Sequence, residues 1–182
     1  MPPPGQEISP YGGNSELFVG GVYQFAKATI ANGVAIGTTN VPGFQVGYRL
    51  HLTDFNAIEV RYSYGQPTQA YGPTITVKSR NSEISFAYVW TYPATGPIRP
   101  FFLGGAGFVH YVPIASGSTP GSATQTRPTF VYGGGLDFKI SNRWSIRAEY
   151  RGLIYRMPDF NQIAVGKFNH NAEPDIGVVM HF

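Results

Sequence analysis

The chain has 182 residues, of which 23 are glycine and 15 are proline, and aromatic residues make up 15% of it against only six leucines. This composition excludes a helix-rich fold, because helices favour Leu, Ala, Glu and Lys whereas strands favour aromatic and β-branched residues. Charged residues make up only 13%, the net charge of +3 includes no basic run typical of nucleic-acid binding, and the absence of cysteine excludes disulfides and thiolate metal sites.

The beginning of the chain differs in pattern from the rest. Residues 1–13 are rich in Pro and Gly and lack the apolar stretch of a secretory signal. We therefore expect residues 1–13 to be a disordered lead, and the sequence to be the mature form of an exported protein. Residues 14–182 are expected to form one β-domain, in which no apolar run approaches the roughly 18 residues of a transmembrane helix.

Eight segments alternate apolar and polar residues with the period of two expected of β-strands. In chain order they are Glu16–Phe25, Phe44–Leu52, Ile58–Tyr64, Glu83–Trp90, Phe101–Tyr111, Phe130–Ile140, Trp144–Arg151 and Asp175–Phe182. In the fifth segment both alternate sets are apolar, and we assign the odd-numbered set to the apolar face of the sheet. That set consists of Phe101, Leu103, Val109 and Tyr111.

The connections between these strands alternate in length. The long ones are 27–43, 65–74, 113–127 and 157–172, and the short ones are 53–56, 93–98 and 141–143. This alternation is typical of an up-and-down barrel in a membrane, with turns on one side and loops on the other. The sequence therefore predicts an all-β fold: an eight-stranded antiparallel transmembrane β-barrel with four long loops and three short turns.

The charges indicate which face of the barrel meets lipid. Of the 23 charged residues, 11 lie on the polar faces of the strands among small residues, and the other 12 lie in the tail, turns, loops or strand ends. An eight-stranded barrel has an interior just wide enough for side chains. The bulky aromatic residues of the apolar face would overfill it, so we expect them to face lipid and the small and charged residues to face the lumen.

Charged side chains in so narrow a lumen must pair, because an unpaired buried charge is costly. We predict one connected network, made of Arg49, Glu59, Arg61, Glu83, Asp137, Lys139, Arg147, Glu149 and Arg151. Its simplest role is to fill the barrel. The alternative is a gate that opens by exchanging salt-bridge partners.

The end of the chain and two internal segments resemble a known group of proteins. Phe182 ends an alternating apolar series from Ile176, as in the C-terminal signature of bacterial outer-membrane barrels. Arg99–Gly107 and Ser145–Arg151 resemble the small barrels of the OmpA/OmpX/opacity-protein type, and the resemblance covers residues 14–182, the transmembrane domain only. It implies a bacterial outer-membrane location, extracellular loops, periplasmic turns and recognition of Phe182 by the barrel-assembly machinery.

Basic residues outnumber acidic ones at the end of the barrel that carries the long loops. The bases are Lys27, Lys78, Arg80, Arg127, Arg156 and Lys167, and the acids are Asp159 and Glu173. The outer leaflet of such a membrane carries phosphorylated lipopolysaccharide, so we expect a basic collar that binds these phosphates through charge-assisted hydrogen bonds. The alternative is that these are solvated loop charges.

The sequence contains no convincing catalytic pattern. The four histidines, His51, His110, His170 and His181, lack metal-ligand spacing, so we expect no metal or cofactor. His51 beside Thr53 is the nearest match to enzymes that modify lipopolysaccharide, but it faces the lumen and no carboxylate is evidently placed to orient it. We therefore expect a monomeric, non-enzymatic barrel with a structural or surface-interaction role. The alternative is a narrow channel for small, even apolar, solutes, and an enzyme is less favoured.

Overall fold

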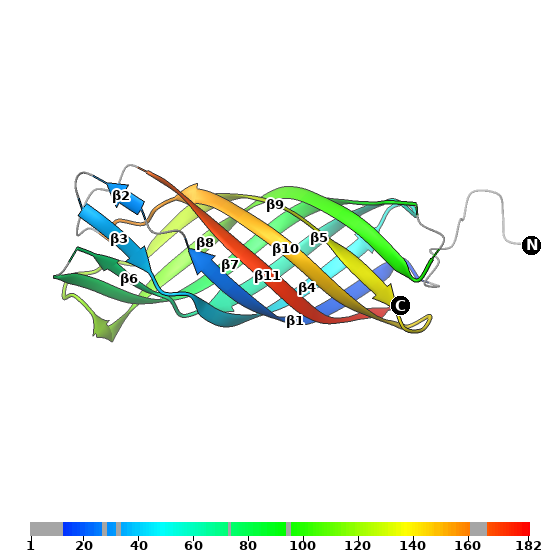
Figure 1. Cartoon of the computed structure of the whole chain (residues 1–182), viewed down its shortest axis with the longest axis horizontal. Helices are drawn as coiled ribbons and strands as arrows, with labels where there is room; N and C mark the ends of the chain where they lie inside the picture. Colours follow the sequence, from blue (N-terminus) through cyan, green and yellow to red (C-terminus); the bar gives the residue numbers. More distant parts are fainter. Residues whose placement is uncertain (1–12, 27–28, 32–33, 73, 94–95, 161–166) are drawn as a thin grey trace, which may run out of the picture.

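The computed structural model describes residues 13–26, 29–31, 34–72, 74–93, 96–160 and 167–182, so most of the predicted N-terminal lead and Lys27 lie outside the described residues. Eight long antiparallel strands form a closed barrel (Figure 1). They are β1 (Ser15–Ala26), β4 (Val41–His51), β5 (Asn56–Gly65), β7 (Ile75–Thr91), β8 (Ile98–Ser118), β9 (Gln125–Lys139), β10 (Trp144–Arg156) and β11 (Phe168–His181). The predicted fold class is confirmed.

The barrel closes where its first and last strands meet. β1 pairs with β11 from Glu16 opposite His181 to Ala26 opposite Asn171. At the end of this seam the backbones of Ser15 and Phe182 exchange two hydrogen bonds of 3.0 Å. Closure leaves the eight strands without a free edge, which satisfies the backbone polar groups across the height of the barrel. No helix among the described residues is long and apolar enough to cross a membrane.

The two ends of the barrel differ. The turn end carries the short turns at 52–55 and 140–143, the end of β7 and the start of β8, together with Phe182. The loop end, opposite, carries three further strands: β2 (Thr29–Ala31), β3 (Val34–Thr38) and β6 (Thr68–Tyr71), which lie at the left of Figure 1. β6 pairs with β7 and β3, and β7 and β8 run for 17 and 21 residues. A membrane-spanning strand needs about 9–11 residues, so the hairpin β7–β8 extends well past that span, and segments expected to be plain loops form a sheet.

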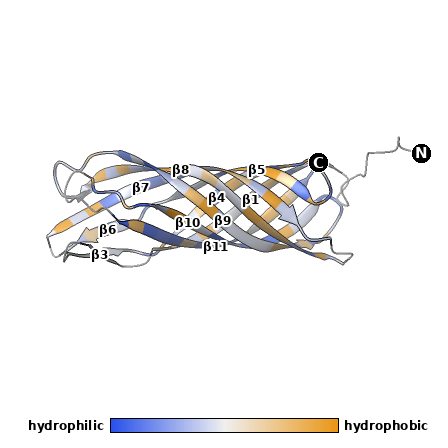
Figure 2. Ribbon diagram, turned by 90° about the horizontal axis from the view of Figure 1, so that it is seen from above, coloured by the Kyte–Doolittle hydropathy of each residue, from blue (hydrophilic) through white to orange (hydrophobic). Residues whose placement is uncertain are grey.

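The two faces of the barrel carry different side chains. Bulky apolar residues point outward, as shown by exposures of 61% for Phe86, 59% for Phe102 and 62% for Ile176. Charged residues of the same strands point inward, where Arg147 and Glu59 are almost fully buried. Hydrophobic and hydrophilic residues follow one another along the strands (Figure 2). An apolar outer face around a charged interior is the reverse of a soluble barrel and fits an apolar belt facing lipid.

In β8 the predicted orientation was wrong. Phe101, Leu103, Val109 and Tyr111 lie inside the barrel, at 0–6% exposure, and Phe102 and the other even-numbered residues face outward. Both alternate sets of this strand are apolar and each includes two small residues, so alternation could not distinguish them. The inner aromatic residues are stabilised in the lumen because arginine side chains pack on their rings. The guanidinium of Arg49, for example, lies 4.5 Å from the ring centre of Phe101.

Candidate functional site

The lumen nearest the turn end is filled by a cluster of ion pairs. Arg147 contacts Asp137 at 2.6 Å and Glu16 at 2.7 Å. Arg49 contacts Glu59 at 2.8 Å and lies within 3.8 Å of Glu16 and 3.7 Å of Asp137. All five side chains are at most 4% exposed. Each arginine thus faces several carboxylates, which offsets the cost of removing its charge from water.

Arg61 connects this cluster to the middle of the lumen. Its two terminal nitrogens donate hydrogen bonds to both oxygens of Glu149, at 2.9 and 3.0 Å. It also lies 2.8 Å from Glu59 and 3.4 Å from Asp175 and donates to Gln45. A bidentate guanidinium–carboxylate pair fixes both groups in orientation as well as in position. The side chain of Arg61 therefore crosses the lumen in a defined geometry.

Arg151 organises the part of the lumen nearest the loop end. It contacts Glu83 at 2.7 Å and lies 3.7 Å from Glu173. Glu173 also accepts hydrogen bonds of 2.9 Å from the side-chain amides of Gln24 and Asn171. These residues come from β1, β7, β10 and β11, so the network ties together strands on opposite walls of the barrel.

Two phenylalanines lie among these charges. The ring of Phe18 is 4.8 Å from the guanidinium of Arg61 and 5.6 Å from that of Arg147. Phe101 lies 4.5 Å from Arg49 and 5.0 Å from Arg147. Aromatic faces attract cations without needing hydrogen bonds. The rings therefore fill the lumen between the ion pairs and leave the carboxylates to accept the hydrogen bonds.

Two facing glycines leave space for the ring of Phe18. Gly20 on β1 lies directly opposite Gly177 on β11, and a Cβ atom on either residue would run into the ring of Phe18 and the facing backbone. A side chain at either position would have to displace the ring that packs on Arg61 and Arg147.

The structure joins the following predicted network residues in one set of connected ion pairs: Arg49, Glu59, Arg61, Glu83, Asp137, Arg147, Glu149 and Arg151. Lys139 lies nearer the turn end, half-buried, opposite Ser145. Three acids join the network that were not predicted in it. Glu16 and Asp175 are the first residues of two predicted strands, whereas Glu173 was expected on the outer rim and is instead a residue of β11 that is 1% exposed in the lumen.

The turn end of the lumen contains a chain of hydrogen bonds through two histidines. His51 Nε2 lies 2.6 Å from Glu16, so the expectation that no carboxylate orients His51 was wrong. Glu16 also lies 3.5 Å from His181 Nδ1, and His181 Nε2 lies 2.8 Å from Ser145 Oγ. The order serine, histidine and carboxylate matches that of a hydrolase triad. However, Ser145 is 0% exposed, so its hydroxyl packs in the wall and is closed to a substrate.

A plug of apolar side chains closes the barrel at the loop end. We define it as Tyr71, Tyr111, Tyr155, Met157 and Phe160, which are at most 5% exposed. Phe160 contacts the rings of Tyr71 and Tyr111, and its φ of 49° is in the left-handed region that a non-glycine residue rarely adopts. The Tyr71 hydroxyl lies 2.7 Å from the carbonyl oxygen of Pro158, and burial raises the pKa of Tyr71. Residues 157–160 therefore fold back into the mouth of the barrel.

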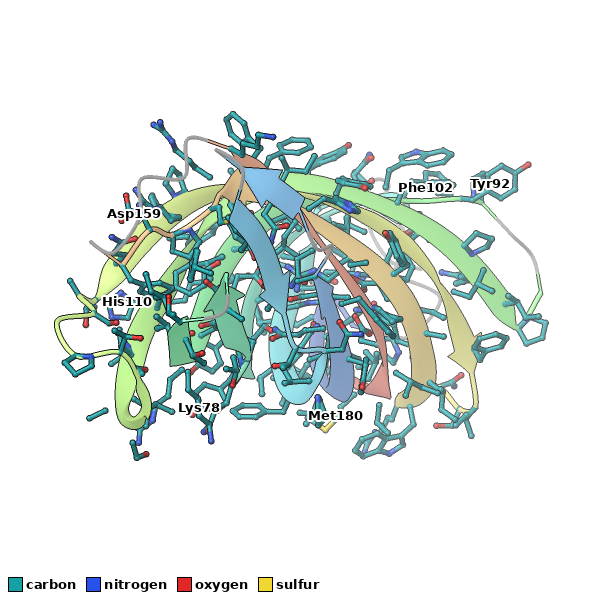
Figure 3. The ribbon with its side chains drawn as sticks, turned by 60° about the vertical axis from the view of Figure 1, so that its left-hand side comes forward. Lys78, Tyr92, Phe102, His110, Asp159 and Met180 are labelled. Atoms are coloured by element: carbon teal, nitrogen blue, oxygen red, sulfur yellow. The ribbon has the colours of Figure 1, made fainter. Side chains whose placement is uncertain are left out.

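The predicted basic collar divides into two groups. Arg80 and Arg156 are exposed on the outer face, where they continue the outward rows of Ile84 and Ile154, and Lys78 lies on the same face as Arg80. Lys167 is exposed. Arg127 instead faces the mouth, where it lies 3.5 Å from Asp159, which also accepts a hydrogen bond from Gln125. Figure 3 shows Lys78, His110 and Asp159 at the loop end, opposite Tyr92 and Phe102.

Comparisons with known proteins agree with this architecture. Residues 9–169 match the family described as "Outer membrane protein beta-barrel domain". No curated protein sequence matches the chain.

Three solved structures have the same fold. Neisserial surface protein A is 13% identical with a TM-score of 0.70, covering 93% of this chain and 97% of its own. OprG from Pseudomonas aeruginosa is 9% identical with a TM-score of 0.65, covering 93% and 97%. The attachment invasion locus protein Ail of Yersinia pestis, in complex with the heparin analogue sucrose octasulfate, is 17% identical with a TM-score of 0.55, covering 93% and 99%.

Proposed function

The chain belongs to the outer membrane β-barrel family, and on that basis we propose that it is a monomeric, non-enzymatic barrel with a closed lumen whose loop end interacts with molecules at the cell surface. In this arrangement the loop end is extracellular, the turn end is periplasmic, and the barrel-assembly machinery recognises Phe182. The observation that carries the proposal is the lumen itself: four arginines at 0–1% exposure and their carboxylates fill it, and the plug closes it at the loop end.

Reconstitution in planar bilayers tests the closed lumen. We expect no steady ion conductance, because a solute would have to break several buried ion pairs at once and also displace the plug. The matched comparison is the variant Tyr71→Ala/Phe160→Ala, which removes two rings of the plug and leaves the ion pairs intact. We expect this variant to show no steady conductance either, because the ion pairs still fill the lumen. Steady current steps in the unmodified protein would contradict the proposal.

A narrow gated channel is the second candidate, and one observation favours it. Arg61 lies within 3.4 Å of three carboxylates, Glu59, Glu149 and Asp175, so it has alternative partners within reach. Exchange among them would open a gap without leaving the guanidinium unpaired. This mechanism predicts brief, rare openings whose frequency changes in Asp175→Asn. Amides line both cavities near the loop end, and two carboxylates line the first of them, which disfavours transport of apolar solutes.

Lipopolysaccharide phosphates are the surface ligand that the outward basic residues fit best. Lys78, Arg80 and Arg156 lie on the outer face at the loop-end edge of the apolar rows, where lipid phosphates would meet them. We expect the triple variant Lys78→Gln/Arg80→Gln/Arg156→Gln to bind lipopolysaccharide on the order of tenfold more weakly, since exposed charge pairs contribute about 0.2–1 kcal/mol each. The salt dependence of binding should fall with it.

The control for this measurement is Arg127→Gln. Arg127 already pairs with Asp159 in the mouth, so its replacement is expected to leave lipopolysaccharide affinity unchanged. Binding that is equally strong in the triple variant and the unmodified protein would identify these side chains as solvated charges without a lipid ligand.

A further inference from the structure

An internal cavity lies between the ion-pair network and the plug. The space open to the centre of a water-sized sphere is about 20 Å³, and the walls of the cavity include Glu83, Glu173, Asn81, Tyr111 and Tyr155. Roughly 10–15 Å³ of such space is needed to hold one water, and pockets for organic ligands are far larger, on the order of 300–1,000 Å³. The cavity therefore suits a single ion with a few waters better than a metabolite.

One oxygen of each carboxylate in this cavity accepts no hydrogen bond from the described residues, although Oε2 of Glu173 lies 3.7 Å from Nη1 of Arg151. Oε1 of Glu83 accepts a hydrogen bond from Arg151, and Oε1 of Glu173 accepts from Gln24 and Asn171. The Oε2 atoms of both glutamates are buried and accept no hydrogen bond from the described residues. Burying a carboxylate oxygen without a hydrogen-bond donor costs free energy. A cation bound to the lone pairs of these two oxygens would offset that cost.

The charge balance of the lumen points the same way. Its strongly buried charged residues are the acids Glu16, Glu59, Glu83, Asp137, Glu149, Glu173 and Asp175 and the bases Arg49, Arg61, Arg147 and Arg151. Among the described residues, acids thus exceed arginines by three. Near the cavity the imbalance is local, because Glu83 and Glu173 share one arginine, Arg151.

We propose that this cavity binds a hard metal cation through the Oε2 atoms of Glu83 and Glu173. No group of three His, Cys, Asp or Glu side chains that could hold a metal is found among the described residues, so neutral oxygens complete the set. Asn171 and Gln24 line the cavity and donate their NH₂ groups to Glu173, so amide groups of the kind that can supply such oxygens stand beside the carboxylate. Carboxylates with amide oxygens and water are ligands that Ca²⁺ accepts in variable geometry.

A second cavity adjoins the first on the side of the loop end. Its space open to the centre of a water-sized sphere is about 10 Å³, and it shares Gln24, Asn81, Tyr155 and Asn171 with the first. It extends to Thr39, which is exposed. Both cavities therefore lie on the loop-end side of the cluster around Arg147 and Arg49, and the site does not depend on any surface role of the loop end.

Luminescence of Tb³⁺, which replaces Ca²⁺ at oxygen sites, tests the proposal on the full chain refolded in zwitterionic detergent micelles. Because Tyr111 and Tyr155 line the cavity, exciting tyrosine should give a saturable Tb³⁺ signal that excess Ca²⁺ removes. We expect the signal to be lost in Glu83→Gln and in Glu173→Gln. Asp159→Asn is the matched control, since it removes a carboxylate at the same end that does not line this cavity, and it should keep the signal.

Two readouts keep the test decisive if a variant folds poorly. Heat-modifiable gel mobility shows that each variant forms the barrel before Tb³⁺ is added. The urea midpoint of the unmodified protein should rise with Ca²⁺, because a ligand that binds only the folded state stabilises it. A Tb³⁺ signal that persists in both glutamine variants, or an unmodified protein with neither the signal nor the Ca²⁺-dependent rise, would overturn the proposal.

Discussion

Replacing Arg147 by Ala is expected to destabilise the folded barrel by about 3–5 kcal/mol, the usual cost of removing one partner from a buried ion pair. Arg147 is 0% exposed and lies 2.7 Å from Glu16 and 2.6 Å from Asp137. Its loss would leave these two carboxylates to share Arg49, which lies 3.8 Å from Glu16 and 3.7 Å from Asp137. The free energy of unfolding, measured by urea titration of the refolded protein, checks this.

Two comparisons separate loss of the ion pairs from loss of an arginine in general. Arg80→Ala removes an exposed guanidinium and should change the unfolding free energy by no more than about 0.5 kcal/mol. Arg147→Met/Asp137→Asn removes the charge of one partner along with the arginine, so it should recover part of the lost stability. Equal urea midpoints for Arg147→Ala and Arg80→Ala would show that the network contributes nothing measurable to folding.

The sequence predicts most of the barrel because alternation is a local property. Ile58 and Glu59 are adjacent, and in a strand adjacent side chains point to opposite faces, so their placement needs no knowledge of the partner strands. Once an eight-stranded barrel is assumed, the narrow lumen assigns the charged set to the inside. This argument placed Glu59, Arg61 and Arg147 correctly in the lumen.

Alternation fails where a strand is apolar on both faces or where its end is misjudged. Phe101 was placed outside because nothing local shows that two arginines from other strands pack on its ring. Glu173 was placed on the rim because β11 begins at Phe168, earlier than the apolar pattern indicated. Small strands such as β6 are too short to show a pattern.

Partners in the lumen are set by the pairing register, which one sequence does not reveal. Glu16 and Arg147 meet although 131 residues separate them, because β1 and β10 both flank β11. The same holds for Glu83 and Glu173, which converge on Arg151 from β7 and β11. The sequence therefore predicts that a network exists, but neither which residues are bonded nor where the carboxylate oxygens without a hydrogen bond lie.

Replacing Phe182 by Ala is expected to reduce insertion of the barrel into the outer membrane severalfold while leaving in-vitro refolding nearly unchanged. The side chain is 56% exposed on the outer face at the turn end, near the ring of Tyr48, so a partner protein can reach it. The backbone of Phe182, in contrast, exchanges two hydrogen bonds with Ser15 at the seam. Deleting the residue would break these bonds, so a loss of recognition could not be distinguished from a loss of stability. The substitution Phe182→Ala preserves the bonds.

The measurement compares the amount of folded barrel in outer-membrane fractions with the urea midpoint of the same variant refolded in detergent. Phe102→Ala is the matched control, because Phe102 is also an outward-facing aromatic near the turn end, at 59% exposure, but lies far from the chain terminus. It should insert as well as the unmodified protein. If Phe182→Ala inserts equally well, the terminal ring is an ordinary member of the lipid-facing belt. If both variants insert poorly to the same degree, the membrane interface needs aromatic rings in general and the terminal one carries no separate signal.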